Sequence, residues 1–167
     1  MTCSYSVSYP WVWSTWVKAP VLKTKKLYIV SACLPYVNRE LFEKIANDGA
    51  VLMACPEREP PTHYGKIASM IRSSRPEEII VITVDGSPHC FTLQASVNEA
   101  EYILGEKLKK KHYVLVDGEK LVEIDSNAIR LARYLHIVDE LYKKHKKEVE
   151  DKLSKHSLEY RQAKSYR

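Results

Sequence analysis

Three of the four cysteines in this chain follow short apolar segments that have the character of buried strands. Cys33, Cys55 and Cys90 each come after such a segment, where a parallel strand would end. The carboxyl ends of parallel strands lie along one edge of a sheet, and ligand crevices open at that edge. We therefore expect these three thiols, although far apart in the sequence, to be neighbours in space.

Cys90 is the cysteine with the clearest chemistry, because it is predicted to lie in the first turn of a helix. Ser87 followed by Pro88 is typical of a helix start, with a capping residue and then proline. Free N–H groups and the helix dipole stabilise a thiolate at such a position. His89 can add positive charge or a metal-ligating nitrogen, and Asp85 precedes this group. The sequence predicts Cys90 and Asp85 as catalytic residues.

Several kinds of cysteine site are compatible with these residues. Three thiolates and one imidazole match the ligand number of a zinc ion or an iron–sulfur cluster, which predicts Cys33, Cys55, Cys90 and His89 as metal ligands. No Cys-x-x-Cys pair is present, so the spacing is not that of a zinc finger or a ferredoxin. Without metal, Cys90 with Cys33 or Cys55 as the resolving thiol would carry out disulfide or persulfide chemistry. A structural disulfide is a further alternative.

Nucleotide binding through a glycine-rich loop is disfavoured. The segment after the first predicted strand reads Cys33-Leu-Pro-Tyr and contains no glycine. Phosphate-binding loops need glycines there, because the backbone must turn tightly and approach the phosphates.

The elements that must position these cysteines alternate along the chain. Apolar segments at residues 27–32, 50–54 and 78–84 are separated by segments of helical periodicity. This order predicts a three-layer α/β fold around a mostly parallel sheet, of the flavodoxin-like or Rossmann-like βαβαβα type. Residues 114–116 and 121–124 then predict a β-hairpin at one edge of the sheet.

Local signals indicate where the turns and helices begin and end. Asn38 and Thr62 are predicted to cap the first two helices. Gly49 is predicted to end the first helix in a left-handed conformation. Asp117 and Gly118 are predicted to form the tight turn of the hairpin.

The chain ends favour contact with a partner. Residues 1–24 are predicted to form an extended aromatic arm, 25–142 a single α/β domain, and 143–167 the protruding basic end of a long helix that begins at residue 126. Such a helix would be about 55 Å long at 1.5 Å per residue, longer than a domain of this size is wide. We expect a homo-oligomer or a partner protein, bound through the arm and the helix. A non-catalytic interaction or scaffold protein with structural cysteines is the alternative function.

Charge and composition further limit the classes of binding partner and the cellular location that we expect. The net charge of +5 resides entirely in residues 126–167, whereas residues 1–125 carry equal numbers of acidic and basic residues. Nucleic-acid binding by the fold is therefore disfavoured. No apolar run is long enough to span a bilayer, and no secretory signal is recognisable, so a cytoplasmic location is expected. The scarcity of glutamine beside many Lys and Glu is weakly typical of proteins from hot-growing organisms.

Overall fold

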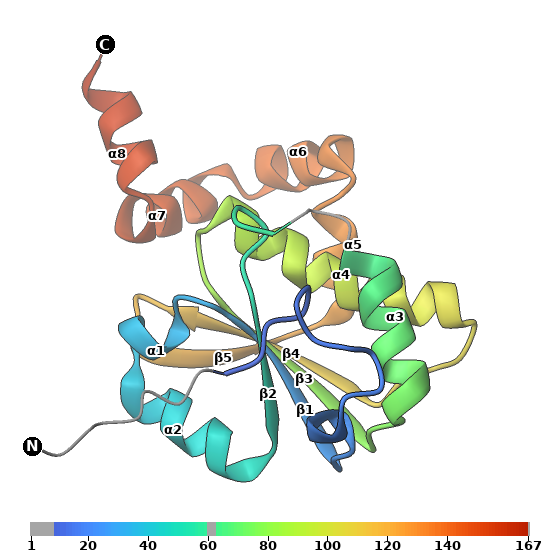
Figure 1. Cartoon of the computed structure of the whole chain (residues 1–167). Helices are drawn as coiled ribbons and strands as arrows, with labels where there is room; N and C mark the ends of the chain where they lie inside the picture. The colour runs from blue at the N-terminus through green and yellow to red at the C-terminus, as the bar shows by residue number, and fades with distance from the viewer. Residues whose placement is uncertain (1–8, 60–62, 167) are drawn as a thin grey trace, which may run out of the picture. The chain divides into compact units, whose positions relative to one another are not determined.

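The computed structural model describes residues 9–59 and 63–166, and it is built around one five-stranded sheet (Figure 1). The strand order is β2-β1-β3-β4-β5; the first four strands run parallel and β5 is antiparallel to β4. The strands are β1 (Lys26–Ser31), β2 (Ala50–Ala54), β3 (Glu78–Val84), β4 (Lys110–Val116) and β5 (Lys120–Ile124). The helices connected with the sheet are η1 (Pro20–Leu22), α1 (Leu34–Val37), α2 (Arg39–Asp48), α3 (His63–Ser74) and α4 (Pro88–Leu104).

Helices cover both faces of the sheet, which confirms the predicted three-layer α/β architecture. On one face, Leu27 and Ile29 pack in a buried cluster with Ile67 of α3 and Leu93 of α4. Alternate residues of the same strands enter the second buried cluster, whose members include Tyr28, Val30, Phe42 and Ile45. This alternation follows from the pleat, because successive side chains of a strand point to opposite faces.

The hairpin is confirmed, but its first strand is longer than predicted. β4 begins at Lys110 and pairs in parallel with β3, so the sheet has a fourth parallel strand before the chain reverses. Asp117 and Gly118 both have positive φ, as the tight turn between β4 and β5 requires. β4 begins with Lys110, Lys111, His112 and Tyr113, so its first half lacks the continuous apolar character by which the other parallel strands were recognised.

The capping predictions have mixed outcomes. Asn38 caps α2, since its side chain accepts a hydrogen bond from the Leu41 N–H at 2.9 Å. Thr62 lies outside the described residues. Gly49 ends α2 in extended backbone rather than the predicted left-handed conformation. Its real constraint is close packing, because a Cβ added there would lie 2.5 Å from the carbonyl oxygen of Lys26.

The predicted long C-terminal helix is wrong. The segment forms four shorter helices, α5 (Ser126–Leu131), α6 (Leu135–Lys144), α7 (Lys146–His156) and α8 (Leu158–Ser165). Its backbone leaves the helical conformation at His145 and again at Ser157. The Ser157 hydroxyl then accepts from the Tyr160 N–H at 3.1 Å, so this residue caps a new helix instead of continuing the old one.

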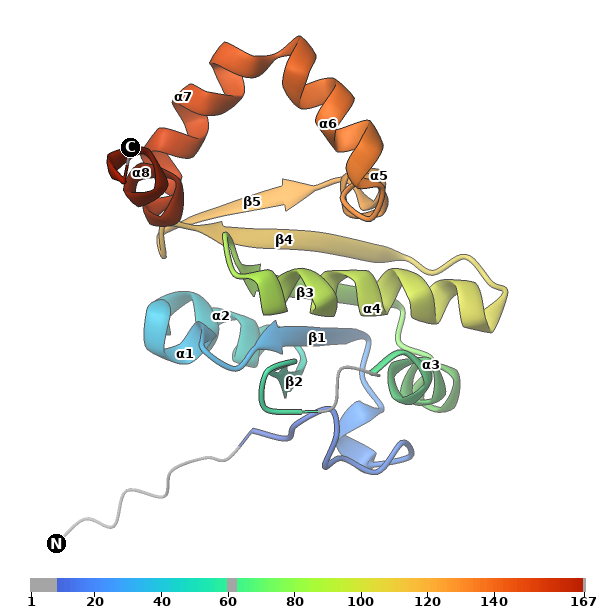
Figure 2. The same ribbon diagram turned by 90° about the horizontal axis from the view of Figure 1, so that it is seen from above.

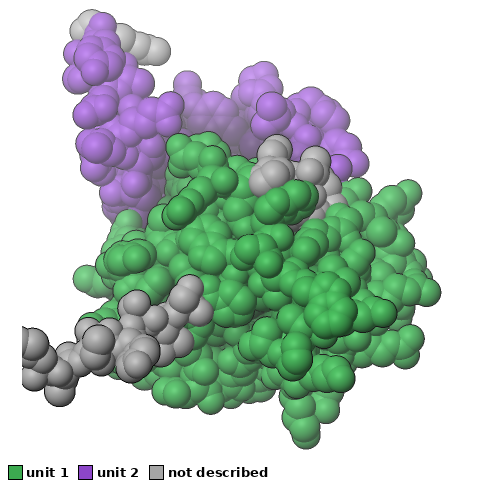
Figure 3. Space-filling view, in the orientation of Figure 1, with its two compact units in different colours: residues 1–124 green, residues 125–167 purple. Residues whose placement is uncertain are grey.

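The chain forms two compact units, residues 1–124 and residues 125–167 (Figure 3). The division falls after Ile124, earlier than the boundary expected near residue 142. The second unit has its own internal contacts. Tyr142 of α6 donates to Glu150 of α7 at 2.9 Å, and Arg161 of α8 donates to the carbonyl of Lys155 at 2.9 Å. No helix among the described residues is long and apolar enough to cross a membrane.

Residues 9–24 of the predicted arm lie on the first unit. Trp11 forms a parallel bridge with Met53 of β2, in which the Val12 N–H donates to the Met53 carbonyl and the Met53 N–H to the Pro10 carbonyl, both at 2.9 Å. Val12 is fully buried. Trp13 and Trp16 are exposed, so only part of this aromatic segment anchors the chain.

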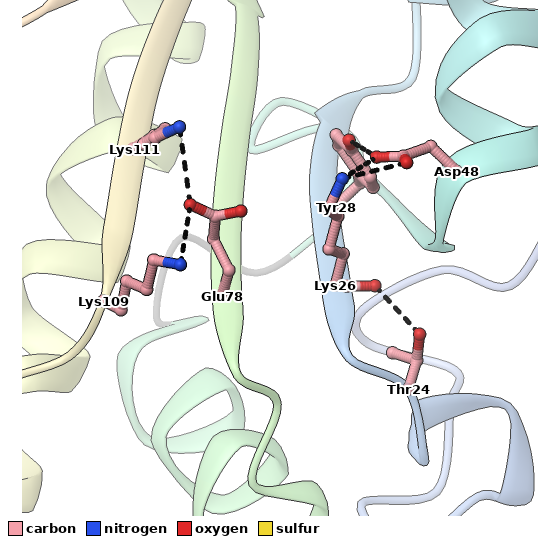
Figure 4. A network of polar contacts seen from close by, with 7 residues as sticks. All are labelled: Thr24, Lys26, Tyr28, Asp48, Glu78, Lys109 and Lys111. Carbon is pink, nitrogen blue, oxygen red and sulfur yellow. Dashed lines mark hydrogen bonds and ion pairs between the residues drawn. The ribbon is translucent and has the colours of Figure 1, made fainter.

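Ion pairs fix the amino ends of the parallel strands (Figure 4). Lys26 donates to the Asp48 carboxylate at 2.8 Å, and the Tyr28 hydroxyl donates to the same carboxylate. The bond from Lys26, followed by that from Tyr28, lowers the pKa of Asp48. Glu78 is buried and lies 3.5 Å from the Lys111 ammonium. These contacts stabilise the edge of the sheet opposite to the cysteines.

Candidate thiol site

The carboxyl edge of the sheet collects the segments that carry the three cysteines (Figure 2). β1 lies between β2 and β3, and the last residue of β1, Ser31, is paired in register with Ala54 of β2. The Ala32 N–H continues this ladder to the Ala54 carbonyl at 2.9 Å. Cys33 therefore follows β1, and Cys55 follows β2, the neighbour of β1 on one side.

Cys90 reaches the same edge from the first turn of α4. As predicted, Ser87 caps this helix and Pro88 is its first residue; the Ser87 hydroxyl accepts from the Cys90 N–H at 3.4 Å. The Cys90 sulfur lies 3.1 Å from the hydroxyl oxygen of Ser31, a residue that is buried at the end of β1. The thiol is thus in contact with the end of β1, and the backbone N–H of Cys90 is in contact with its own helix cap.

A buried polar network holds α4 in place on the sheet. The Gln94 amide, one turn after Cys90, donates to the Thr83 hydroxyl at 2.9 Å and to the Tyr113 carbonyl at 2.8 Å. Its oxygen lies 2.7 Å from Nδ1 of His112, which is also buried. Because such a network has a high cost of disruption, it fixes the register of α4 and with it the position of Cys90.

The pKa of the Cys33 thiol is influenced by both of the other thiols. Partial desolvation is the largest cause that raises its pKa, and the neighbouring Cys55 and Cys90 thiols raise it further, followed by Glu57. The residue itself is exposed. All three cysteines are free. This arrangement follows from the strand order, since β1 is the shared neighbour of β2 and β3.

Cys55 is held by a carboxylate that the sequence analysis did not identify. Glu59 is buried; one of its oxygens accepts from the Cys55 N–H at 3.2 Å and the other from the Trp13 N–H at 3.0 Å. The Glu59 side chain thereby links the cysteine loop to the N-terminal aromatic segment. A charged residue five positions after a strand gives no sequence signal for this role, because Trp13, one of its two partners, is 46 positions away.

His89 and Asp85 lie at the same edge and are exposed, as Cys33 is, whereas Cys55 and Cys90 are half-buried. Nδ1 of His89 is 3.6 Å from a carboxylate oxygen of Glu57, in a half-exposed pair. The Asp85 side chain is exposed, and its backbone N–H extends the β3–β4 ladder to the Leu115 carbonyl at 3.1 Å.

Ser31 and Glu57 were also missed by the sequence analysis. Ser31 carried a usable signal, because it is the polar residue at the carboxyl end of an otherwise apolar strand. Within residues 9–59 and 63–166, no group of three or more His, Cys, Asp or Glu side chains has an arrangement that could hold a metal ion.

Comparisons with known proteins identify the fold and leave the chemistry open. A family model described as "Rossmann-like domain" matches residues 19–167. A protein of Archaeoglobus fulgidus named "Uncharacterized protein" is 29% identical over 112 residues, which cover 67% of this chain and 73% of the relative. No solved structure matches the chain.

Proposed function

We propose that this chain, which belongs to the Rossmann-like domain family, carries out thiol–disulfide exchange with Cys90 as the attacking thiol and Cys33 as the resolving thiol. The observation that carries the proposal is the convergence of three thiols from neighbouring parallel segments. Cys55 and Cys90 both influence the ionisation of Cys33. Free thiols gathered at one edge of a sheet are an arrangement in which a reversible disulfide can form.

Cys90 and Cys33 have unequal surroundings that suit different roles. Cys90 lies in a helix first turn and within hydrogen-bond distance of the Ser31 hydroxyl, where donors can stabilise a thiolate. The raised pKa of Cys33 keeps its thiol protonated to higher pH. Cys90 is therefore the better nucleophile, and Cys33 is the better second thiol.

The reaction balances with an external disulfide as the oxidant. The Cys90 thiolate attacks one sulfur of the disulfide, forms a mixed disulfide and expels the other sulfur as a thiolate. The Cys33 thiol loses its proton and attacks the Cys90 sulfur, which forms the Cys33–Cys90 disulfide and releases the second thiol. Two protein thiols are oxidised, and one external disulfide is reduced to two thiols. A persulfide donor would enter by the same attack and leave its outer sulfur on Cys90.

The test uses the full chain with Cys3→Ser, which removes the cysteine outside the described residues. After treatment with hydroxyethyl disulfide, peptide mass spectrometry should find a Cys33–Cys90 disulfide. With Cys33→Ser added, the mixed disulfide should accumulate on Cys90. If Cys90→Ser leaves the rate of disulfide consumption unchanged, Cys90 is not the nucleophile and the proposal fails.

The alternative is the predicted cofactor, a zinc ion or an iron–sulfur cluster bound by Cys33, Cys55, Cys90 and His89. The same protein preparation distinguishes a bound cofactor from free thiols. Protein purified without oxygen would then contain stoichiometric metal or show visible cluster absorption. The dithiol proposal requires all three thiols of the edge to titrate freely with a thiol reagent before any chelator is added.

A second role is favoured by the helices of the second unit. Large apolar side chains are exposed there: Leu135 is 75% exposed, Leu158 59% and Tyr166 84%. Side chains of this size are seldom left in water in numbers unless another surface covers them. We propose that α6–α8 contact a second copy of the chain or a partner protein, alongside the thiol chemistry.

A further inference from the structure

We propose that the substrate of the thiol site is a cysteine-bearing polypeptide segment with apolar and basic neighbours, rather than a small acidic thiol. The inference rests on the proposed function and names the substrate class of the same site. Two properties of the carboxyl edge carry it: exposed apolar groups beside each thiol, and exposed carboxylates around them.

The segment that carries each thiol, or a segment hydrogen-bonded to it, also carries an exposed large apolar side chain. Tyr36 (89% exposed) and Val37 (43%) follow Cys33 in α1, and Phe91 (37%) follows Cys90 in α4. Trp13 (48%) adjoins Cys55 through the carboxylate of Glu59 that their two N–H groups share. We refer to Trp13, Tyr36, Val37 and Phe91 as the apolar rim. An extended peptide offers side chains to such a rim on either side of its cysteine, whereas a small thiol cannot contact all of it.

The apolar rim is held by the fold rather than carried on loose loops. Val37 lies beside the β4–β5 turn, since a Cβ at Gly118 would approach its side chain to 3.2 Å. The adjacent Asn38 amide donates to the Gly118 carbonyl at 3.1 Å. Glu59, which is buried, fixes the Trp13 backbone. Binding such a prearranged surface costs little ordering entropy.

The charge at this edge favours a basic peptide. Four carboxylates that follow the carboxyl ends of the parallel strands are on exposed residues: Glu57, Asp85, Asp117 and Glu119. Among the basic groups that follow the same strands, Arg58 lies over the Trp11 ring, His89 faces Glu57, and Lys120 is exposed. The four carboxylates thus outnumber the two Lys and Arg side chains of these segments. Small thiol carriers bear carboxylates or phosphates and would be repelled here, whereas lysines or arginines beside a substrate cysteine would be attracted.

The experiment compares probes that carry the same reactive group. Each probe cysteine is a mixed disulfide with 2-thiopyridine, whose release is followed by absorbance. The probes are one peptide with Lys and Leu beside its cysteine, the same peptide with Glu and Leu, and glutathione. Rates with the full Cys3→Ser chain are divided by rates with free N-acetylcysteine amide. The normalised rate with the Lys peptide should be about tenfold or more higher than that with glutathione. The normalised rate with the Glu peptide should be well below that with the Lys peptide.

Two rim variants and a matched control locate the contact. Tyr36→Ser and Phe91→Ser should each lower the normalised rate with the Lys peptide severalfold. Tyr102→Ser replaces an equally exposed tyrosine at the far end of α4 and should leave that rate unchanged. Circular dichroism before each assay verifies that the variants are folded.

The outcomes separate this inference from the function on which it rests. If glutathione reacts as fast as the Lys peptide, or the rim variants behave like Tyr102→Ser, a polypeptide substrate is refuted while thiol exchange stands. If no probe reacts faster with Cys90 than with the free model thiol, thiol exchange itself is refuted.

Discussion

Ser31 Oγ and Cys90 Sγ lie 3.1 Å apart and join the end of β1 to the first turn of α4 across 59 positions of sequence. Ser31 is almost completely buried, so its hydroxyl has little competition from water. A hydroxyl at this distance can donate to a thiolate and thereby stabilise the nucleophilic form.

Ser31→Ala should therefore slow alkylation of Cys90 by iodoacetamide at neutral pH. A hydrogen bond worth about 0.5–1.5 kcal/mol corresponds to a rate lower by about two- to tenfold. Peptide mass spectrometry of timed samples gives the rate at Cys90 alone. Ser74→Ala is the matched control, because it removes a half-buried serine that donates to the Met70 carbonyl in α3. An equal rate in both variants would show that the Ser31 contact does not influence the sulfur.

Cys33 should show the alkylation profile of a thiol whose pKa is raised. A raised pKa means that the thiolate appears only at higher pH, so the midpoint of Cys33 alkylation should lie above that of a cysteine in a denatured sample. Replacing both neighbours in Cys55→Ser/Cys90→Ser should lower this midpoint, because their negative charges are removed. The remaining elevation measures desolvation, the largest cause. A midpoint that does not move in the double variant would contradict the closeness of the three thiols.

Two glycines provide a matched test of packing at the α2–β2 junction. Gly49→Ala places a methyl group 2.5 Å from the Lys26 carbonyl and should destabilise the fold by about 1–3 kcal/mol. Gly65→Ala, in α3, meets no atom within 4 Å and should stabilise it by about 0.5–1 kcal/mol. Urea denaturation followed by circular dichroism measures both. Similar effects of the two substitutions would contradict the close approach at Gly49.

Deleting residues 146–167 should separate self-association from folding. These residues form α7 and α8 in the second unit, so the melting temperature should change little while the particle mass by light scattering falls. Leu158→Ser in the full chain should reduce the mass in the same direction, because it removes an exposed apolar contact. A monomeric full-length chain, or a large loss of stability on truncation, would remove the support for this interface.

The sequence predicted the layers of the fold well where burial dominates. The runs that became β1, β2 and β3 are apolar on both faces, and only a sheet covered by helices on both sides buries such strands. Ser87 and Pro88 located the start of α4 because helix capping is a local interaction. β4 was only partly identified, since its pairing with β3 is decided by neighbours far away in sequence.

The C-terminal helices and the packing around the thiols were harder to predict for physical reasons. A thin apolar stripe of Val149, Leu153 and Tyr160 is compatible with one helix or several, and the difference depends on single capping residues such as Ser157. Glu59 acts through two backbone N–H groups that only the folded chain brings together. The thiol edge was predictable because topology alone gathers strand ends, whereas the contact of Cys90 with Ser31 depends on the register of α4.

The bridge between Trp11 and Met53 also affects the tendency of the protein to aggregate. An uncovered outer strand has unpaired N–H and C=O groups with which strands of other molecules can form hydrogen bonds. Val12 and Pro10 occupy both backbone groups of Met53, the next-to-last residue of β2, on the outer side of this strand. The N-terminal segment therefore also protects against aggregation, because its proteolysis or detachment would expose this part of the outer side of β2 to pairing with strands of other molecules.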